Sequence, residues 1–228
     1  AVRAAAVEVK RRLLALAAEE LGVAEEDLVF GGAKIASRTD PAKEVEIVRM
    51  QALRRRGLVV GIGYRGENTE TKVINPFAAQ FCEVEVNMRT GETRVLRFLG
   101  AHDSGRVMDR LTYDNQVFGG ITMGIGFALT EERILDHGQT GKMANRNWHD
   151  YKIPTMLDTP ADMTSLPIEL PDPEANTVGA KGLGEPVTIP TAPAVANALR
   201  HAAGVRVTDT PAHPPRLLEK LAAARKEG

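Results

Sequence analysis

The sequence predicts an α+β fold in which helices pack on mixed sheets. Apolar residues recur at helical spacing over residues 1–21 and again over 192–203, and a glycine follows each stretch. Alternating apolar residues flank the pair Thr90-Gly91 and indicate a β-hairpin. With 228 residues, of which 43% are hydrophobic, the chain can bury a core in one large domain or two small ones. We expect two intertwined subdomains, residues 1–100 and 101–228.

The first hundred residues are predicted to contain two helices and two hairpins. Gly22 and Gly57 each follow a helical pattern and can adopt the left-handed conformation that ends a helix. The arginine run before Gly57 is favourable near a helix C-terminus, so it indicates a solvated last turn. In order, we expect a helix over residues 1–21, a hairpin over 28–37, a helix over 42–56, irregular chain over 58–76 and the hairpin centred on Thr90-Gly91.

The remaining residues are predicted to contain a glycine-rich buried helix, a long loop and two further helices. The stretch from about 111 to 132 is apolar enough for a buried helix. Its glycines would each cost about 1 kcal/mol relative to alanine, which implies close packing against another element. Residues 136–177 contain five prolines and indicate a loop that wraps over the scaffold. Two helices follow, over 192–203 and 216–226, and the glycines of the buried helix are Gly119, Gly120, Gly124 and Gly126.

Charge and cysteine content exclude several classes of protein. The 29 lysines and arginines balance 30 acidic residues, so no net field attracts nucleic acid or an acidic membrane surface. The one cysteine, Cys82, cannot form an internal disulfide, and it is expected to be a packed core thiol. The sequence shows neither a secretory signal nor a membrane-spanning run, so we expect a cytoplasmic location. Because the chain begins at Ala1 inside an expected helix, we also expect a processed or truncated product.

Glu185 is the strongest candidate for chemistry, because it lies among glycines and directly before a proline. The segment 178–186 reads Val-Gly-Ala-Lys-Gly-Leu-Gly-Glu-Pro. Glycines allow a ligand to approach the backbone closely, and Pro186 favours extended backbone at Glu185, which would aim the carboxylate in one direction. Backbone N–H groups beside it could bind an anionic cofactor group. The local alternative is that Glu185 lies in a turn or at the start of the following helix.

Other polar residues have weaker signals. Gln116 precedes a glycine pair and could face whatever approaches there, or it could satisfy a buried backbone group. The pairs His102-Asp103 and His149-Asp150 could suggest a catalytic dyad, but adjacent residues on a strand point to opposite faces, so local hydrogen bonding is favoured. The remaining histidines do not have the spacing of a zinc site.

Five motifs occur in a fixed order that resembles the C-terminal part of the molybdenum-binding subunit of the xanthine dehydrogenase and aldehyde oxidase family. The resemblance runs from about residue 1 to residue 221, nearly the whole chain. No motif is decisive by itself, and the five in order are specific. They are residues 81–86 with Thr90-Gly91, 102–106, 116–120 with 124–126, 150–154, and 182–186.

The resemblance implies a cofactor and roles for particular residues. Members of this family hold molybdenum on a molybdopterin, in some cases as its cytosine dinucleotide, and hydroxylate an electron-poor carbon of an aldehyde or N-heterocycle with water-derived oxygen. Glu185 would be the general base. Gln116 would lie close to the metal and pterin, and the backbone of Lys181, Gly182, Leu183 and Gly184 would run along the cofactor. No residue of this chain is expected to bind the metal directly.

The resemblance also implies partners, because family subunits are several times longer than this chain. The expected partners are the missing N-terminal half of the molybdenum-binding subunit, iron–sulfur and FAD-containing chains, and a small-molecule substrate. One cysteine cannot hold an iron–sulfur cluster. We therefore expect the isolated chain to be inactive. Alternatives are a non-catalytic assembly or cofactor-loading module or a gene remnant of the same fold, and, among enzymes, a carbon monoxide dehydrogenase-type large subunit.

Overall fold

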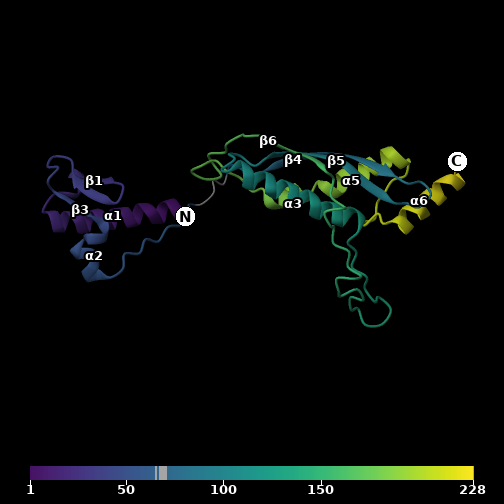
Figure 1. Ribbon diagram of the computed structural model, residues 1–228, viewed down its shortest axis with the longest axis horizontal. Coiled ribbons are helices and arrows are strands. Elements are labelled where there is room, and N and C mark those ends of the chain that lie inside the picture. The colour runs from purple at the N-terminus through teal and green to yellow at the C-terminus, as the bar shows by residue number, and fades with distance from the viewer. Residues whose placement is uncertain (65, 67–70, 228) are drawn as a thin grey trace. The chain divides into compact units, whose positions relative to one another are not determined.

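The computed structural model describes residues 1–64, 66 and 71–227, and the chain forms two compact units, Ala1–Glu67 and Asn68–Gly228 (Figure 1). Each unit contains a three-stranded sheet together with helices, so the predicted α+β class is confirmed. The division differs from the predicted boundary near residue 100. That boundary falls inside strand β5 (Thr93–Asp103), which pairs along its length with strand β4 (Phe77–Val86). Residues on both sides of position 100 therefore belong to one unit.

The first unit combines helix α1 (Val2–Leu21) with a small antiparallel sheet. Gly22 ends α1 in the left-handed conformation with a φ of 60°, as predicted. The predicted hairpin over residues 28–37 is also present. The core of this unit contains Leu16, Ala17, Leu28, Ile35 and Met50. The other elements are η1 (Glu25–Asp27), β1 (Leu28–Gly31), β2 (Lys34–Ser37), β3 (Glu44–Glu46), η2 (Ile47–Arg49) and α2 (Gln51–Arg56).

The predicted helix over residues 42–56 is wrong in its first part. Strand β3 occupies that part and pairs antiparallel with β2, where Val45 lies opposite the buried Ile35. Within the stretch 42–56, only α2 is α-helical. β-branched residues such as valine fit a pleated surface, and the pairing with β2 overrides the helical spacing. Residues 58–64, 66 and 71–76 contain no helix or strand, as predicted, whereas residues 65 and 67–70 lie outside the described residues.

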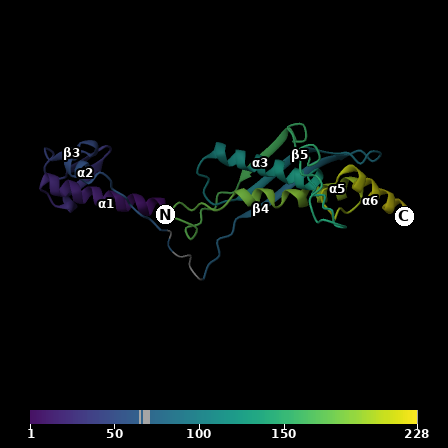
Figure 2. The same ribbon diagram turned by 90° about the horizontal axis from the view of Figure 1, so that it is seen from below.

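The second unit contains the sheet β4-β5-β6, with helices α3 (Arg110–Leu129) and α5 (Thr191–Ala203) on one face (Figures 1 and 2). The β4-β5 hairpin turns at Gly91, which has a φ of 76°, in agreement with the prediction. Strand β6 (Asp162–Pro167) pairs parallel with β5 and lies inside the stretch predicted as a loop. Two further helices are α4 (Gly184–Thr188) and α6 (Pro214–Glu227).

The core of the second unit joins α3 and α5 to the inner face of β5. Val117, Ile121 and Ile125 of α3 are buried together with Phe98 of β5 and Leu199 of α5. The side chain of Asp109 accepts a hydrogen bond from Thr112 N at 2.8 Å and so caps the N-terminus of α3. The partly buried Cys82 packs against this core, as predicted, and burial raises the pKa of its thiol to about 12.

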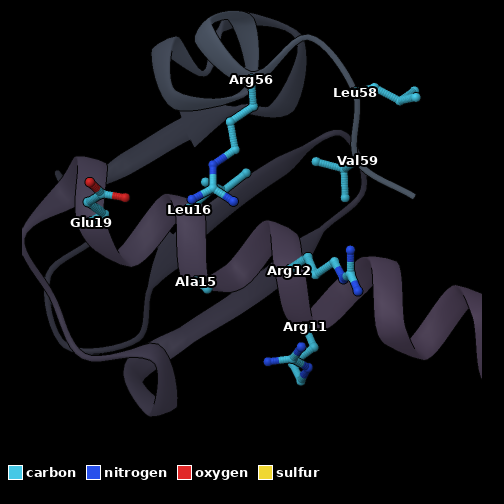
Figure 3. Close-up of a pocket in the computed structure, with 8 residues that line it drawn as sticks. All are labelled: Arg11, Arg12, Ala15, Leu16, Glu19, Arg56, Leu58 and Val59. Carbon is cyan, nitrogen blue, oxygen red and sulfur yellow. The ribbon is translucent and has the colours of Figure 1, made fainter. Parts of the chain in front are cut away.

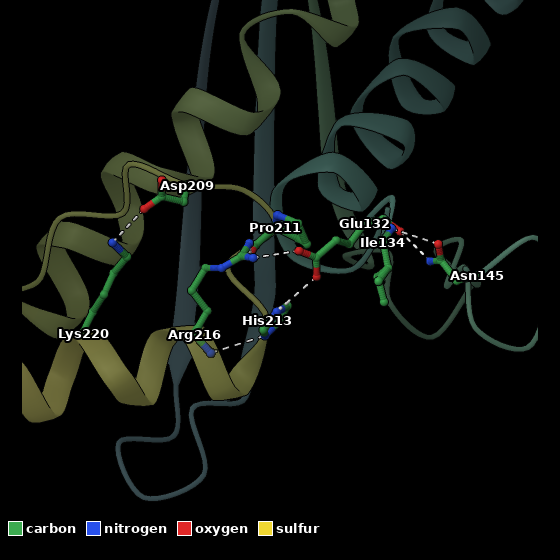
Figure 4. A network of polar contacts seen from close by, with 8 residues as sticks. All are labelled: Glu132, Ile134, Asn145, Asp209, Pro211, His213, Arg216 and Lys220. Carbon is green, nitrogen blue, oxygen red and sulfur yellow. Dashed lines mark hydrogen bonds and ion pairs between the residues drawn. The ribbon is translucent and has the colours of Figure 1, made fainter. Parts of the chain in front are cut away.

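The segment after α3 is fastened to the start of α6 by a polar network (Figure 4). The carboxylate of Glu132 accepts a hydrogen bond from Arg216 Nη2 at 2.7 Å and lies 3.3 Å from His213 Nε2. Asn145 donates to Glu132 O at 2.6 Å and accepts from Ile134 N at 2.9 Å. The start of the irregular segment after α3 is therefore held in place by contacts with α6 and with Asn145.

Within the described part of the chain, no helix is both long enough and apolar enough to cross a lipid bilayer.

Candidate functional site

Glu185 lies in the first turn of α4, in the second unit. The expectation of extended backbone at this residue is wrong, because α4 begins at Gly184 and continues through Pro186. Proline is tolerated there, since the first N–H groups of a helix have no partner within the helix. The local alternative, in which Glu185 lies at the start of a helix, describes its observed position. Its side chain is exposed, and among the described residues none forms a hydrogen bond or ion pair with its carboxylate.

The glycines around Glu185 fall into two groups. At Gly182 and Gly184 an added Cβ would meet no atom within 4 Å, so the backbone beside the acid is open to a ligand. At Gly105 and Gly179 the backbone is left-handed, with φ values of 67° and 76°. A Cβ at Gly105 would lie 2.2 Å from Gly179 O. Gly182 and Gly184 thus leave space for a ligand, whereas Gly105 allows the segment after β5 to contact the segment that contains Gly179.

Lys181, four residues before Glu185, binds Asp103 and Ser104 at the C-terminal end of β5. Its Nζ lies 2.6 Å from Asp103 Oδ2 and donates to Asn75 O at 3.2 Å, and its side chain is only 6% exposed. Its backbone N–H donates to Ser104 O at 2.7 Å. Burial acts to raise the pKa of Asp103, but the hydrogen bonds from Lys181 and Gly105 N outweigh it, and the net pKa is lowered. The ammonium group of Lys181 is therefore committed to this ion pair.

His102, the neighbour of Asp103 on β5, lies on the opposite face and takes part in a buried polar network. Gln80 Nε2 lies 3.0 Å from His102 Nε2 and donates to Val187 O at 2.7 Å. The Gln80 amide oxygen accepts from Thr191 Oγ1 at 2.6 Å. With this assignment His102 Nε2 would accept, and a neutral ring would carry its proton on Nδ1, which is buried and has no hydrogen-bond partner among the described residues. Burial lowers the pKa of His102, consistent with a neutral ring.

These contacts confirm the predicted hydrogen-bonding role of the His102-Asp103 pair. The two side chains leave the strand on opposite faces, as the alternation of a strand requires. Asp103 binds the chain before Glu185, at Lys181, and His102 binds the chain after it, at Val187, through Gln80. The segment that carries Glu185 is therefore fixed on both sides.

Close packing between α3 and the segment α4–α5 sets the position of Gln116. A Cβ at Gly120 would lie 2.2 Å from Val187 Cγ2, and a Cβ at Gly124 would lie 2.3 Å from Thr191 Cβ. Both segments advance four residues between the two contacts, so they run parallel. Four residues before Gly120 and Val187 in the two segments are Gln116 and Leu183, so we infer that these two residues lie at the same level along α3. Gln116 is exposed, so it does not satisfy a buried backbone group.

The predicted close packing of the glycines in α3 is confirmed at three of the four positions. Gly120 and Gly124 contact α4 and α5, and a Cβ at Gly126 would collide with Glu131 and Pro154. Gly119 faces open space, with no atom within 4 Å of an added Cβ. The buried helix therefore uses its glycines mainly to bring α4 and α5 close.

Gln80 and Thr191 lie beside the candidate site and were not predicted from the sequence. Gln80 is in phase with the inward-facing Cys82 and Val84 on β4. A polar side chain on the apolar side of a strand requires a hydrogen-bond partner, and this pattern was the available signal. Thr191 gives no comparable signal in the sequence.

A hollow in the first unit, of about 360 Å³, does not contain any of these residues (Figure 3). It is lined by Arg11, Arg12 and Arg56 together with five other residues. Arg11 and Arg12 both form ion pairs with Glu8. Among the residues that the structure describes, no group of three or more histidine, cysteine or acidic side chains could hold a metal ion. The segment around Glu185 remains the candidate site.

Comparison with known proteins identifies the family. Residues 1–160 match the family model of the molybdopterin cofactor-binding domain. The chain belongs to this family. Its relatives include a putative xanthine dehydrogenase molybdenum-binding subunit of Escherichia coli K12, which is 39% identical over 157 residues. The aldehyde oxidoreductase molybdenum-binding subunit PaoC of the same organism is 38% identical over 145 residues. These matches cover 68% and 64% of this chain, and 20% of each relative.

A solved structure matches most of the chain. The quinoline 2-oxidoreductase of Pseudomonas putida 86 superposes with a TM-score of 0.69 and 27% sequence identity. The match covers 94% of this chain and 28% of the quinoline 2-oxidoreductase chain. The chain spans about a fifth of the length of the curated relatives named above.

Proposed function

We propose that this chain is part of a molybdenum hydroxylase that oxidises an aldehyde or an N-heterocycle, with Glu185 as the general base. The observation that carries the proposal is the placement of Glu185. Its exposed carboxylate has no partner among the described residues, and it follows a glycine loop whose backbone is open. The names of the relatives, which include xanthine dehydrogenase and aldehyde oxidoreductase subunits, support this class of reaction.

The residues present fit a molybdopterin cofactor. The open space at Gly182 and Gly184 would let the cofactor, with or without a cytosine dinucleotide, lie along the backbone of residues 181–184. Gln116, which is exposed at the level of Leu183, would offer its amide to the same ligand. When bound, the cofactor would supply the metal centre and accept the two electrons released by hydroxylation.

The task of Glu185 would be to accept a proton on its carboxylate as the water-derived oxygen attacks the substrate carbon. A positioned base contributes roughly 10² to 10⁴ in rate. This gain requires a fixed geometry, and the contacts of Lys181 and Val187 on either side of Glu185 restrict the backbone that carries it. Residues of this chain would thus hold and aim the base.

We propose that further parts of the assembly complete the site. The curated relatives are about five times as long as the segment matched here. The absent portion would supply the rest of the pocket, and partner chains with iron–sulfur clusters and FAD would carry electrons away, because one cysteine cannot ligate a cluster. The isolated chain would then not turn over substrate.

The test is Glu185→Gln in the purified assembly that contains this chain. Benzaldehyde and hypoxanthine serve as probe substrates with a dye as electron acceptor, and molybdenum per chain is measured in parallel. We expect kcat to fall by about 10² or more while the molybdenum content stays the same. The matched control is Glu219→Gln, an exposed glutamate of α6, which should retain full activity. Full activity of Glu185→Gln would refute the assignment of the base.

A further inference from the structure

We propose that the Lys181–Asp103 ion pair positions Glu185, and that the Lys181 side chain does not bind the cofactor. This inference rests on the proposed function, because it concerns how the base is held. A lysine in a glycine loop beside an anionic cofactor would ordinarily be assigned as its phosphate-binding cation. The contacts of Lys181 argue against that assignment.

The ammonium group of Lys181 is buried and bonded to other groups of the protein. It lies 2.6 Å from Asp103 Oδ2 and 3.2 Å from Asn75 O, and the side chain is 6% exposed. Two of its three N–H donors are therefore used inside the protein. The exposed groups of the loop are instead Gly182, Gly184 and Glu185.

Asp103 connects Lys181 to a tight crossing of two chain segments. Its Oδ1 accepts from Gly105 N at 3.0 Å, while Lys181 N donates to Ser104 O and Arg106 N donates to Gly179 O at 2.9 Å. A Cβ at Gly105 would collide with Gly179 O, and a Cβ at Gly179 would lie 2.9 Å from Pro171 Cβ, so neither residue could carry a side chain without displacement. The ion pair between Lys181 and Asp103 thus adds a side-chain contact to the backbone hydrogen bonds between these two segments, four residues before Glu185.

The second attachment follows two residues after Glu185. Val187 O accepts from Gln80, and Val187 packs on Gly120 of α3. Between these two points the chain has only the residues 182–186, two of which are glycines. Loss of the first attachment would leave a flexible stretch on one side of the base, while the helix α4 itself would still be held by α3.

The experiment compares Asp103→Asn and Lys181→Met, singly and together, in the cofactor-loaded assembly. Asp103→Asn keeps the size of the side chain and its acceptor for Gly105 N, so it removes mainly the charge. Three quantities are measured: molybdenum per chain, kcat and KM for the probe substrates benzaldehyde and hypoxanthine, and amide hydrogen exchange over residues 178–187. Glu219→Gln again serves as the control for a change of exposed charge.

If the pair positions the base, each single variant lowers kcat by roughly 10- to 100-fold, because small misplacements of a catalytic group are costly. KM changes less than threefold, the molybdenum content is unchanged, and amide exchange over 181–185 becomes faster. The double variant is no worse than either single variant, because both remove the same interaction.

Two results would overturn the inference. If Lys181→Met loses molybdenum and Asp103→Asn retains it, Lys181 binds the cofactor itself. If both variants speed amide exchange but leave kcat unchanged, the pair is only structural. A fully active Glu185→Gln enzyme would overturn both the proposed function and the positioning role, while the exchange data would still report whether the pair anchors the loop. If Lys181→Met does not fold, the Asp103→Asn results decide by themselves.

Discussion

Gly120 of α3 and Val187 of α4 are packed so closely that a methyl group at Gly120 would lie 2.2 Å from Val187 Cγ2. Real Cβ atoms do not approach carbon to this distance, so α4 would have to move. The contact therefore couples the helix that carries Glu185 to the longest buried helix of the second unit.

Gly120→Ala should destabilise the protein by about 1–3 kcal/mol through overpacking, although alanine favours a helix by about 1 kcal/mol relative to glycine. Gly119→Ala is the matched control, because its Cβ would meet open space, and it should be neutral or stabilise by up to about 1 kcal/mol. Urea unfolding followed by circular dichroism gives both free energies. Equal effects at the two positions would contradict the packing described above.

Gln80→Leu should destabilise the protein by about 1–3 kcal/mol, because it leaves the buried His102 Nε2 without its partner and removes the hydrogen bonds of Gln80 to Val187 O and Thr191 Oγ1, which keep only the bond to each other. Gln80→Glu tests the direction of the hydrogen bonds. A carboxylate cannot donate to Val187 O, so this variant should also be destabilised. Unfolding free energies within 0.5 kcal/mol of the parent, roughly the effect of a neutral surface change, would show that the network is dispensable.

The stability of the protein should fall as the pH drops below about 6.5 because of His102. Burial lowers the pKa of His102 below 6.5, so the folded state binds fewer protons at this ring than the unfolded state does. The stability that this lowered pKa contributes is fully present above 6.5, the pKa of His102 in the unfolded state, and it is lost as the pH falls towards the pKa in the folded state. Urea midpoints measured from pH 7.5 to pH 5 should decline less steeply in His102→Gln. An identical decline in both proteins would exclude this group as the cause.

Cys82 should react slowly with iodoacetamide in the folded protein. The pKa of its thiol is about 12, against 9.0 for an unperturbed thiol, so the thiolate fraction at pH 8 is lower by roughly a thousandfold. Mass spectrometry should show complete labelling in 6 M guanidinium chloride and little labelling in buffer over the same time. Equally fast labelling of the folded protein would mean that the thiol is not buried as described.

The elements that the sequence predicted well depend on local signals. Helix α1 ends at Gly22, and the β4-β5 hairpin turns at Gly91, because in each case glycine supplies a left-handed backbone within the element's own sequence. Strand β6 was missed because its stability comes from parallel pairing with β5, more than fifty residues earlier in the chain, and it lies among prolines. Strand β3 was taken for a helix because its pairing with β2 is likewise not encoded locally.

The candidate site was predictable only in part for the same reason. The glycines around Glu185 marked the segment, but the helical backbone of Glu185 and the burial of Lys181 depend on contacts with β5 and α3. Asp103 is 78 residues away from Lys181 in the sequence, so no spacing rule could pair them. The polar position of Gln80 on the apolar face of β4 was the one visible sign of the network that fixes α4.

The parallel contact of α3 with α4 and α5 makes this region far more sensitive to changes in length than to changes in residue type. Inserting one residue between Gln116 and Gly120 would turn Gln116 by about 100° around the axis of α3, because an α-helix has 3.6 residues per turn. Gln116 would then leave the level of Leu183, while Gly120 and Gly124 would still face Val187 and Thr191. We therefore expect single-residue insertions at this point to remove Gln116 from the site and to destabilise the protein, because they also turn the buried Tyr113 away from the core, whereas the irregular segment after α3 should accept them.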